Sequence, residues 1–81
     1  MTIGDPAAAR AKVLSGTLRH DPPAKTWGGN GNGRACDGCE LPIAETDLEI
    51  EADFPQGQTL RFHSDCFRAW QRAAEERRGI A

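Results

Sequence analysis

Two pairs of metal-binding residues with equal spacing constrain this chain more than any other feature. Cys36 and Cys39 form a Cys-x-x-Cys pair, and His63 and Cys66 form a His-x-x-Cys pair further along the chain. Three thiolates and one imidazole are a donor set that zinc binds in a closed tetrahedron. A two-residue gap lets one tight turn present both sulfurs, and we expect Gly38 to supply a positive φ there. The pattern predicts one structural Zn²⁺ bound by these four residues.

The size and composition of the chain favour a metal over other sources of stability. The sequence has 81 residues and is only 38% hydrophobic, so its core must be small. Three cysteines are an odd number, and a disulfide framework would leave one unpaired. The first residues lack the pattern of a secretory signal, and no apolar run is long enough to cross a bilayer. We therefore expect a cytoplasmic protein whose thiols stay reduced.

The residues between and after the two pairs predict a hairpin followed by a helix. Apolar and acidic residues alternate through 47–53, which places the acidic side chains on a solvated face, and alternation returns through 59–63. A helix is predicted over 64–79, with Ser64 as its N-cap and Gly79 just past its last turn. A turn, a hairpin and a helix in this order predict a small α+β fold, the zinc-stabilised treble clef.

The N-terminal residues predict a separate helix over 5–18. Asp5 can cap the first turn, and Pro6 suits the first helical position, where its missing N–H costs nothing. Gly16 weakens the end, so the helix is expected to stop near residues 14 and 15. Its predicted apolar face consists of Ala7, Ala11, Leu14 and Leu18.

The stretch 20–35 predicts a flexible linker without regular structure. It contains two adjacent prolines, and four glycines lie within 27–33. A phosphate-binding loop would follow a strand, open a helix and end in Gly-Lys-Ser/Thr, and this run does none of these. We expect Trp27 to pack onto the domain and pin the linker. The predicted organisation is an N-terminal helix in 1–19, this linker, and a zinc-finger domain in 36–81.

The ligand spacing over residues 36–66 resembles the first finger of a LIM domain, a module for protein interactions that holds two zincs. No second ligand set follows Cys66, so the LIM partners are not implied here. The pattern "CDGCELPI…LEIEAD…LRFHSDCFRAW" also resembles small uncharacterised bacterial proteins of this length. They share a C-x-x-C-x-x-P-I start, an acidic strand and an L-R-F-H-x-x-C-F-x-x-W end. This second resemblance covers residues 14–72 and implies a single-zinc treble clef without an assigned activity.

The distribution of charge separates the chain into an acidic middle and weakly basic ends. Residues 36–63 carry seven acidic groups and one basic group, which argues against a phosphate-binding surface there. Arginines on the outer side of the predicted second helix are the best candidates for contact with nucleic acid or an acidic protein. These are Arg68, Arg72, Arg77 and Arg78, and Trp27 is a further candidate for a partner contact.

Three functions remain open from the sequence. The favoured hypothesis is a protein-interaction or adaptor module, with the N-terminal helix as a tethered docking element and an unidentified protein as partner. The first alternative is a nucleic-acid-binding regulator that uses the arginines of the second helix. The second is a thiol redox protein, which would leave His63 and Cys66 without a role. His20 is expected in a surface loop. No nucleophile–base set is visible, so we expect neither enzymatic activity nor a small-molecule substrate, and no membrane contact.

Overall fold

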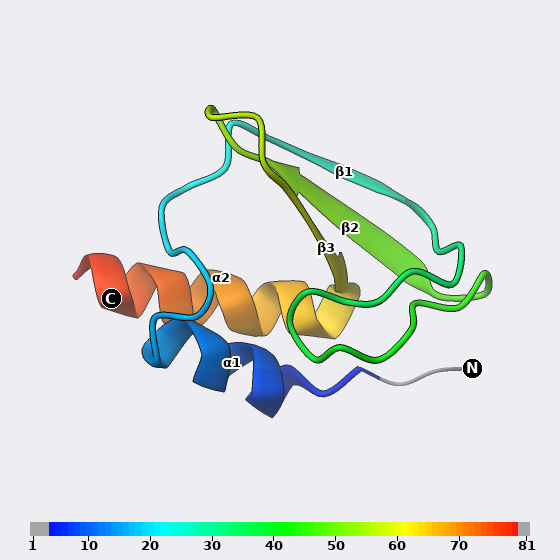
Figure 1. Cartoon of the computed structure of the whole chain (residues 1–81), viewed down its shortest axis with the longest axis horizontal. Coiled ribbons are helices and arrows are strands. Elements are labelled where there is room, and N and C mark those ends of the chain that lie inside the picture. The colour runs from blue at the N-terminus through cyan, green and yellow to red at the C-terminus, as the bar shows by residue number, and fades with distance from the viewer. Residues whose placement is uncertain (1–3, 80–81) are drawn as a thin grey trace.

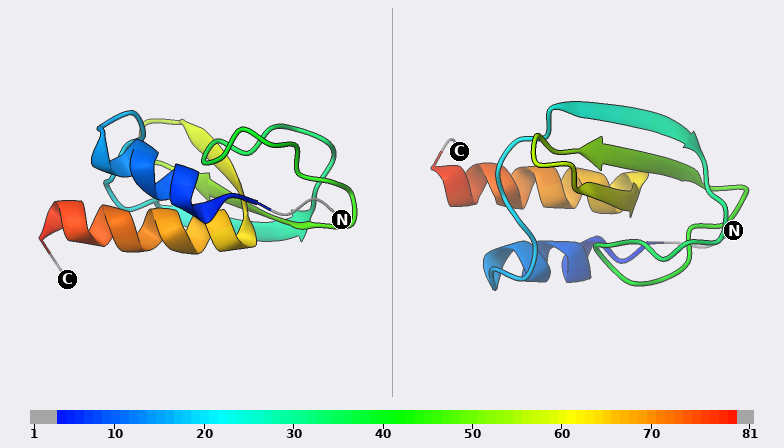
Figure 2. Two further views of the ribbon diagram at one scale, coloured as in Figure 1. Left: turned by 90° about the horizontal axis from the view of Figure 1, so that it is seen from below. Right: turned by 45° about the horizontal axis from the view of Figure 1, so that its top comes forward.

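The computed structural model describes residues 4–79 and has an α+β fold (Figure 1). Two helices accompany one antiparallel sheet of three strands, in the spatial order β1-β2-β3. The helix α2 lies between the sheet and α1 (Figures 1 and 2). In chain order the elements are α1 (Pro6–Leu14), β1 (Lys25–Asn30), β2 (Leu48–Asp53), β3 (Thr59–His63) and α2 (Ser64–Arg78).

The hairpin and the second helix form where the sequence predicts them. β2 pairs with β3 so that Ile50 lies opposite Phe62, and Gly57 takes a φ of 91° in the connecting turn. Gly79 ends α2 in the left-handed conformation, as expected for a glycine at that position. Ser64 is not the N-cap, because α2 follows β3 directly: His63 occupies the capping position, and its side chain makes no capping hydrogen bond.

The expectation of an irregular linker is wrong in its central part, because β1 lies there. β1 pairs along its whole length with β2, so that Trp27 lies opposite Glu51. All six residues of β1 are exposed, and backbone pairing rather than side-chain burial holds the strand in place. Trp27 does not pack onto the core and is 54% exposed, although its indole N–H donates to Asp53 Oδ2 at 2.7 Å.

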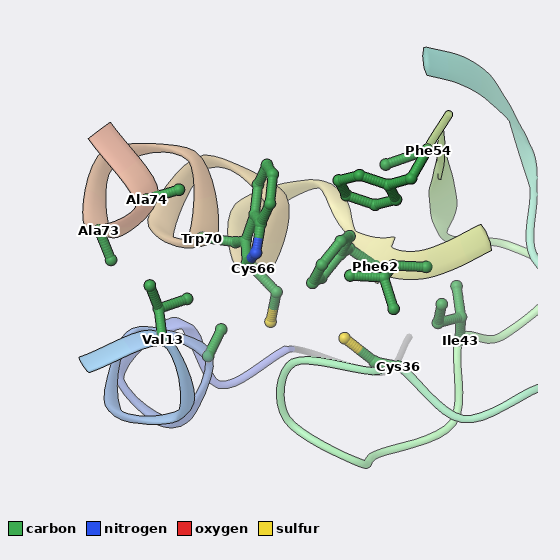
Figure 3. Packing of buried hydrophobic residues seen from close by; sticks show 12 residues of the cluster. Val13, Cys36, Ile43, Phe54, Phe62, Cys66, Trp70, Ala73 and Ala74 are labelled. Carbon is green, nitrogen blue, oxygen red and sulfur yellow. The ribbon is translucent and has the colours of Figure 1, made fainter. Parts of the chain in front are cut away.

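The helix α1 ends at Leu14 as expected, but it buries a different face. Ala9 and Val13 are completely buried, whereas Leu14, on the predicted face, is 46% exposed. Small residues let α1 approach α2 closely, and Val13 points toward Ala73 of that helix (Figure 3). The helix is therefore part of the hydrophobic core rather than a tethered element.

Trp70 lies at the centre of that core. Its ring is 5.7–6.0 Å from the rings of Phe54, Phe62 and Phe67, and its indole N–H donates to the carbonyl oxygen of Arg19 at 2.9 Å. The hydrogen bond secures the loop between α1 and β1 against α2. Neither described helix has the length and apolar character that a membrane span requires.

The acidic row of β2 is not uniformly solvated. Glu49 is only 7% exposed, and one of its carboxylate oxygens has no hydrogen-bond partner among the described residues. Leu48, expected on the buried face, is 51% exposed. Both differences follow from position in the sheet. Glu49 lies opposite the buried His63 in the β2–β3 register. Leu48 lies beside the glycine-rich β1, where Gly28 has no side chain to cover it.

Candidate metal centre

The structure brings together the four residues of the two sequence pairs. Their ligand atoms all lie within 4.8 Å of one another, so Cys36, Cys39, His63 and Cys66 could hold one metal ion. Cys36 and Cys39 stand on the turn before β2, His63 ends β3, and Cys66 lies in the first turn of α2. Figure 3 shows the sulfurs of Cys36 and Cys66 pointing toward each other across the space between this turn and α2.

The imidazole of His63 is oriented for metal binding through Nδ1. This atom lies 3.4 Å from Cys39 Sγ and 3.9 Å from Cys66 Sγ. Two ligands of a tetrahedral zinc, one sulfur and one nitrogen, are about 3.5 Å apart, so these distances fit such a site. Nε2 lies 3.1 Å from the carbonyl oxygen of Pro42. With Nδ1 on the metal, Nε2 carries the proton and donates to that oxygen, which fixes the ring.

The turn that presents the two cysteines is attached to β3 through Asp37. The Asp37 carboxylate accepts from the Arg61 amide at 2.7 Å, and the Asp37 amide donates to the Arg61 carbonyl oxygen at 2.7 Å. The residue with positive φ is Glu40, at 69°, and not Gly38 as expected. Gly38 is required for a different reason, since a Cβ there would lie 2.8 Å from Ala9 Cβ of α1.

The three thiols lie in largely buried surroundings, where a bound cation would strongly favour their deprotonated form. Cys36, His63 and Cys66 are at most 3% exposed, and burial raises the pKa of the Cys36 and Cys66 thiols. Burial also acts on Cys39, yet backbone hydrogen bonds from Asp5 and Leu41 hold the pKa of Cys39 below its ordinary value. A bound cation would turn all three into thiolates and release their protons.

No protein-family model, curated protein or solved structure matches this chain. The resemblance to a LIM finger therefore rests on the ligand spacing.

The four arginines proposed as partner contacts fall into two groups. Arg77 donates to the carbonyl oxygens of Val13 and Leu14 at 3.1 and 3.0 Å, at the C-terminal end of α1. Arg78 donates to the carbonyl oxygen of His20. These two residues hold α1 and its following loop against α2 and are not free side chains of an outer face. Arg68 and Arg72 are exposed and line a shallow groove between the helices, together with Arg10 and the acidic residues Asp65 and Glu75.

One set of residues around the metal centre carries no sequence signal. The start of α1 and the residues before it contact the Cys36–Cys39 turn and Cys66. No motif or periodicity links segments so far apart in the chain, so only the tertiary structure identifies this contact.

Proposed function

We propose that this protein is a zinc-stabilised interaction module in which the metal is structural. Three thiolates and one imidazole are a donor set typical of structural zinc. Four protein ligands leave no open position for water or substrate, which supports a binding role over catalysis. The order of cysteine turn, hairpin and helix supports a treble-clef arrangement, with β1 added to the hairpin and α1 packed on α2.

The interaction role rests on the free edge of β1. The Gly31 amide donates to the Asp47 carbonyl oxygen at 3.0 Å. This bond shows which residues of β1 direct their backbone groups toward β2, namely the odd-numbered ones. By alternation, the backbone N–H and C=O groups of Thr26, Gly28 and Asn30 point away from β2. Such an unpaired row is a template on which an extended peptide can add a further strand.

The charge beside this edge favours a basic partner segment. On the sheet face that carries Trp27, the neighbouring residues of β2 are Glu51, which also faces Arg61 of β3 at 3.4 Å, and Asp53. Lys25 of β1 lies over the Trp27 ring on the same face. Residues 36–63 as a whole carry seven acidic groups and one basic group. We propose that a basic, extended segment of a partner protein pairs with β1, with its side chains beside the exposed indole of Trp27. Backbone pairing supplies affinity, and charge supplies selectivity.

A pair of substitutions at Gly28 tests this role. Gly28→Pro removes an amide that β2 does not use, whereas Gly28→Ala keeps it, and the added Cβ makes ordinary contacts of 3.8 and 3.9 Å with Leu48 and Ile50. A random peptide library displayed on phage is selected against the zinc-loaded protein. We expect basic, extended peptides that bind the wild type and Gly28→Ala equally and Gly28→Pro at least about tenfold more weakly. No enriched peptide, or equal binding to Gly28→Pro, would contradict the proposal.

The two alternatives are weaker because their residues are engaged elsewhere. Arg77 and Arg78 donate to backbone carbonyl oxygens of Val13, Leu14 and His20, which leaves Arg68 and Arg72 as the arginines of α2 available to nucleic acid. Binding of DNA or RNA at low salt would nevertheless favour the regulator, since phosphate contacts strengthen as salt falls. Alkylation of all three cysteines in the metal-loaded, folded protein would favour the redox alternative, because bound zinc protects thiolates.

A further inference from the structure

The backbone of Gly4 lies directly against two of the four metal ligands. A Cβ on Gly4 would lie 2.8 Å from Cys66 Sγ and 2.9 Å from His63 Cβ. It would also lie 2.7 Å from Asp65 Oδ1. Real Cβ atoms do not approach other heavy atoms so closely, so a side chain at this position would force its neighbours to shift. The chain just before α1 therefore covers one side of the metal centre with backbone alone.

The first turns of α1 cover a second side, the Cys36–Cys39 turn. Ala9 occupies the space that a side chain at position 38 would need, so helix and turn are in direct contact. The Lys12 ammonium donates to the Asp37 carbonyl oxygen at 3.0 Å and pairs with Glu40 at 3.2 Å. Residues 4–12 thus lie against Cys66, against His63 and against the turn that presents Cys36 and Cys39.

The same helix is fastened to α2 at points away from the metal. Arg10 pairs with Glu76, and Arg77 donates to the last carbonyl oxygens of α1. These bonds hold α1 in place, while Gly4, Ala9 and Lys12 lie against the ligands or the turn that presents them. Arg10, although it lies within the same segment, pairs with α2 rather than with the metal centre.

We propose that residues 4–12 form a functional part of the metal centre, and that opening of this segment limits the release of the metal. The proposal rests on the proposed binding of zinc. A competing ligand must reach the ion before it can remove it, and Cys36, His63 and Cys66 are at most 3% exposed. A competing ligand can approach Cys39, which is partly exposed, but it reaches the other three ligands only when the backbone at Gly4, or the α1 contact with the cysteine turn, moves away. Local opening of this kind costs less free energy than global unfolding, so the rate of opening can determine the rate of metal release.

Transfer of zinc to a chromogenic chelator, followed at increasing chelator concentration, tests the proposal. For the wild type we expect the rate to reach a plateau, because opening of the segment becomes the slow step. Gly4→Ala should raise the plateau by about tenfold, the lower end of the effect typical of residues that support metal ligands. The matched control is Gly29→Ala, at a glycine with open space around it and no positive φ, and it should transfer zinc at the wild-type rate.

Lys12 provides a second test that keeps the packing at Gly4 intact. Lys12→Met removes the bonds to Asp37 and Glu40 and should raise the plateau, and Lys12→Arg, which can donate to the same oxygens, should restore it. If Gly4→Ala does not fold in excess zinc, the comparison of Lys12→Met with Lys12→Arg tests whether opening of residues 4–12 limits zinc release. A rate that rises linearly with chelator and is equal in all variants would overturn the proposal while leaving zinc binding intact. A wild type that binds no zinc would instead overturn the proposed function.

Discussion

The metal centre and the β1 edge hold their backbone in place by opposite means. At the metal centre, side chains from three segments converge, and three of the four candidate ligands are at most 3% exposed. In β1 every residue is exposed, and the strand is held by its backbone hydrogen bonds to β2. The structure of the first region therefore depends on which side chains are present, whereas that of the second depends mainly on backbone hydrogen bonds. The same difference leaves the ligand side chains of the first region buried and the backbone edge of the second exposed.

The largest expected effect comes from loss of a metal ligand. His63→Ala should leave the protein without bound zinc and largely unfolded, because structural zinc sites supply about 10 kcal/mol or more of folding free energy. The control is His20→Ala, which changes the other histidine of the chain and should keep one zinc per molecule. Metal analysis and far-UV circular dichroism measure both. A folded His63→Ala protein would show that the hydrophobic core, rather than the metal, supplies most of the folding free energy.

The two tryptophans compare the regions directly. Trp70 is 1% exposed and Trp27 is 54% exposed. In urea titrations at saturating zinc, Trp70→Ala should lower the free energy of unfolding by about 3–5 kcal/mol, through lost burial and the cavity left behind. Trp27→Ala should lower it by about 1 kcal/mol or less, since one exposed hydrogen bond is lost. Equal losses would mean that β1 contributes to stability as a core strand does.

Two glycines should respond to alanine with opposite signs. At Gly38 the added Cβ meets Ala9 Cβ at 2.8 Å, and the free energy of unfolding should fall by about 1–3 kcal/mol. At Gly29 no atom lies within 4 Å, and the substitution should be neutral or stabilise by up to about 1 kcal/mol through the unfolded chain. Thermal unfolding with zinc present distinguishes them. A destabilised Gly29→Ala protein would show that β1 needs glycine for its backbone.

The smallest expected effect concerns Asp53. Hydrogen bonds from Thr59 and Trp27 favour its ionised form and lower the pKa of Asp53 in the folded state. Their contribution to stability is therefore present above the unfolded pKa of about 3.9 and is lost as the pH falls through the folded value. Trp27→Phe removes one donor, so carbon-13 NMR titration should give a higher pKa for Asp53 in the variant. An unchanged pKa would show that the indole bond is not maintained in solution.

The sequence by itself determined the elements whose side chains repeat or pair at short range. Alternation predicted β2 and β3, Gly79 marked the end of α2, and two equal spacings identified the four residues that lie together at the candidate metal centre. Each of these signals is local, because strand alternation, helix termini and ligand spacing depend on neighbours within a few positions.

Only the tertiary structure decided the rest, because it depends on partners distant in the chain. β1 has no alternation of apolar and polar residues, and four glycines lie within 27–33, two of them in the strand itself, yet β2 pairs with it through the backbone. The buried face of α1 was set by its neighbours in the fold, since Ala9 lies against the Cys36–Cys39 turn and Val13 points toward Ala73 of α2. Gly4 carries no sequence signal at all, and its position against Cys66 follows from the packing of α1. Backbone pairing and close packing leave little trace in residue type, which is the physical reason that these features escaped prediction.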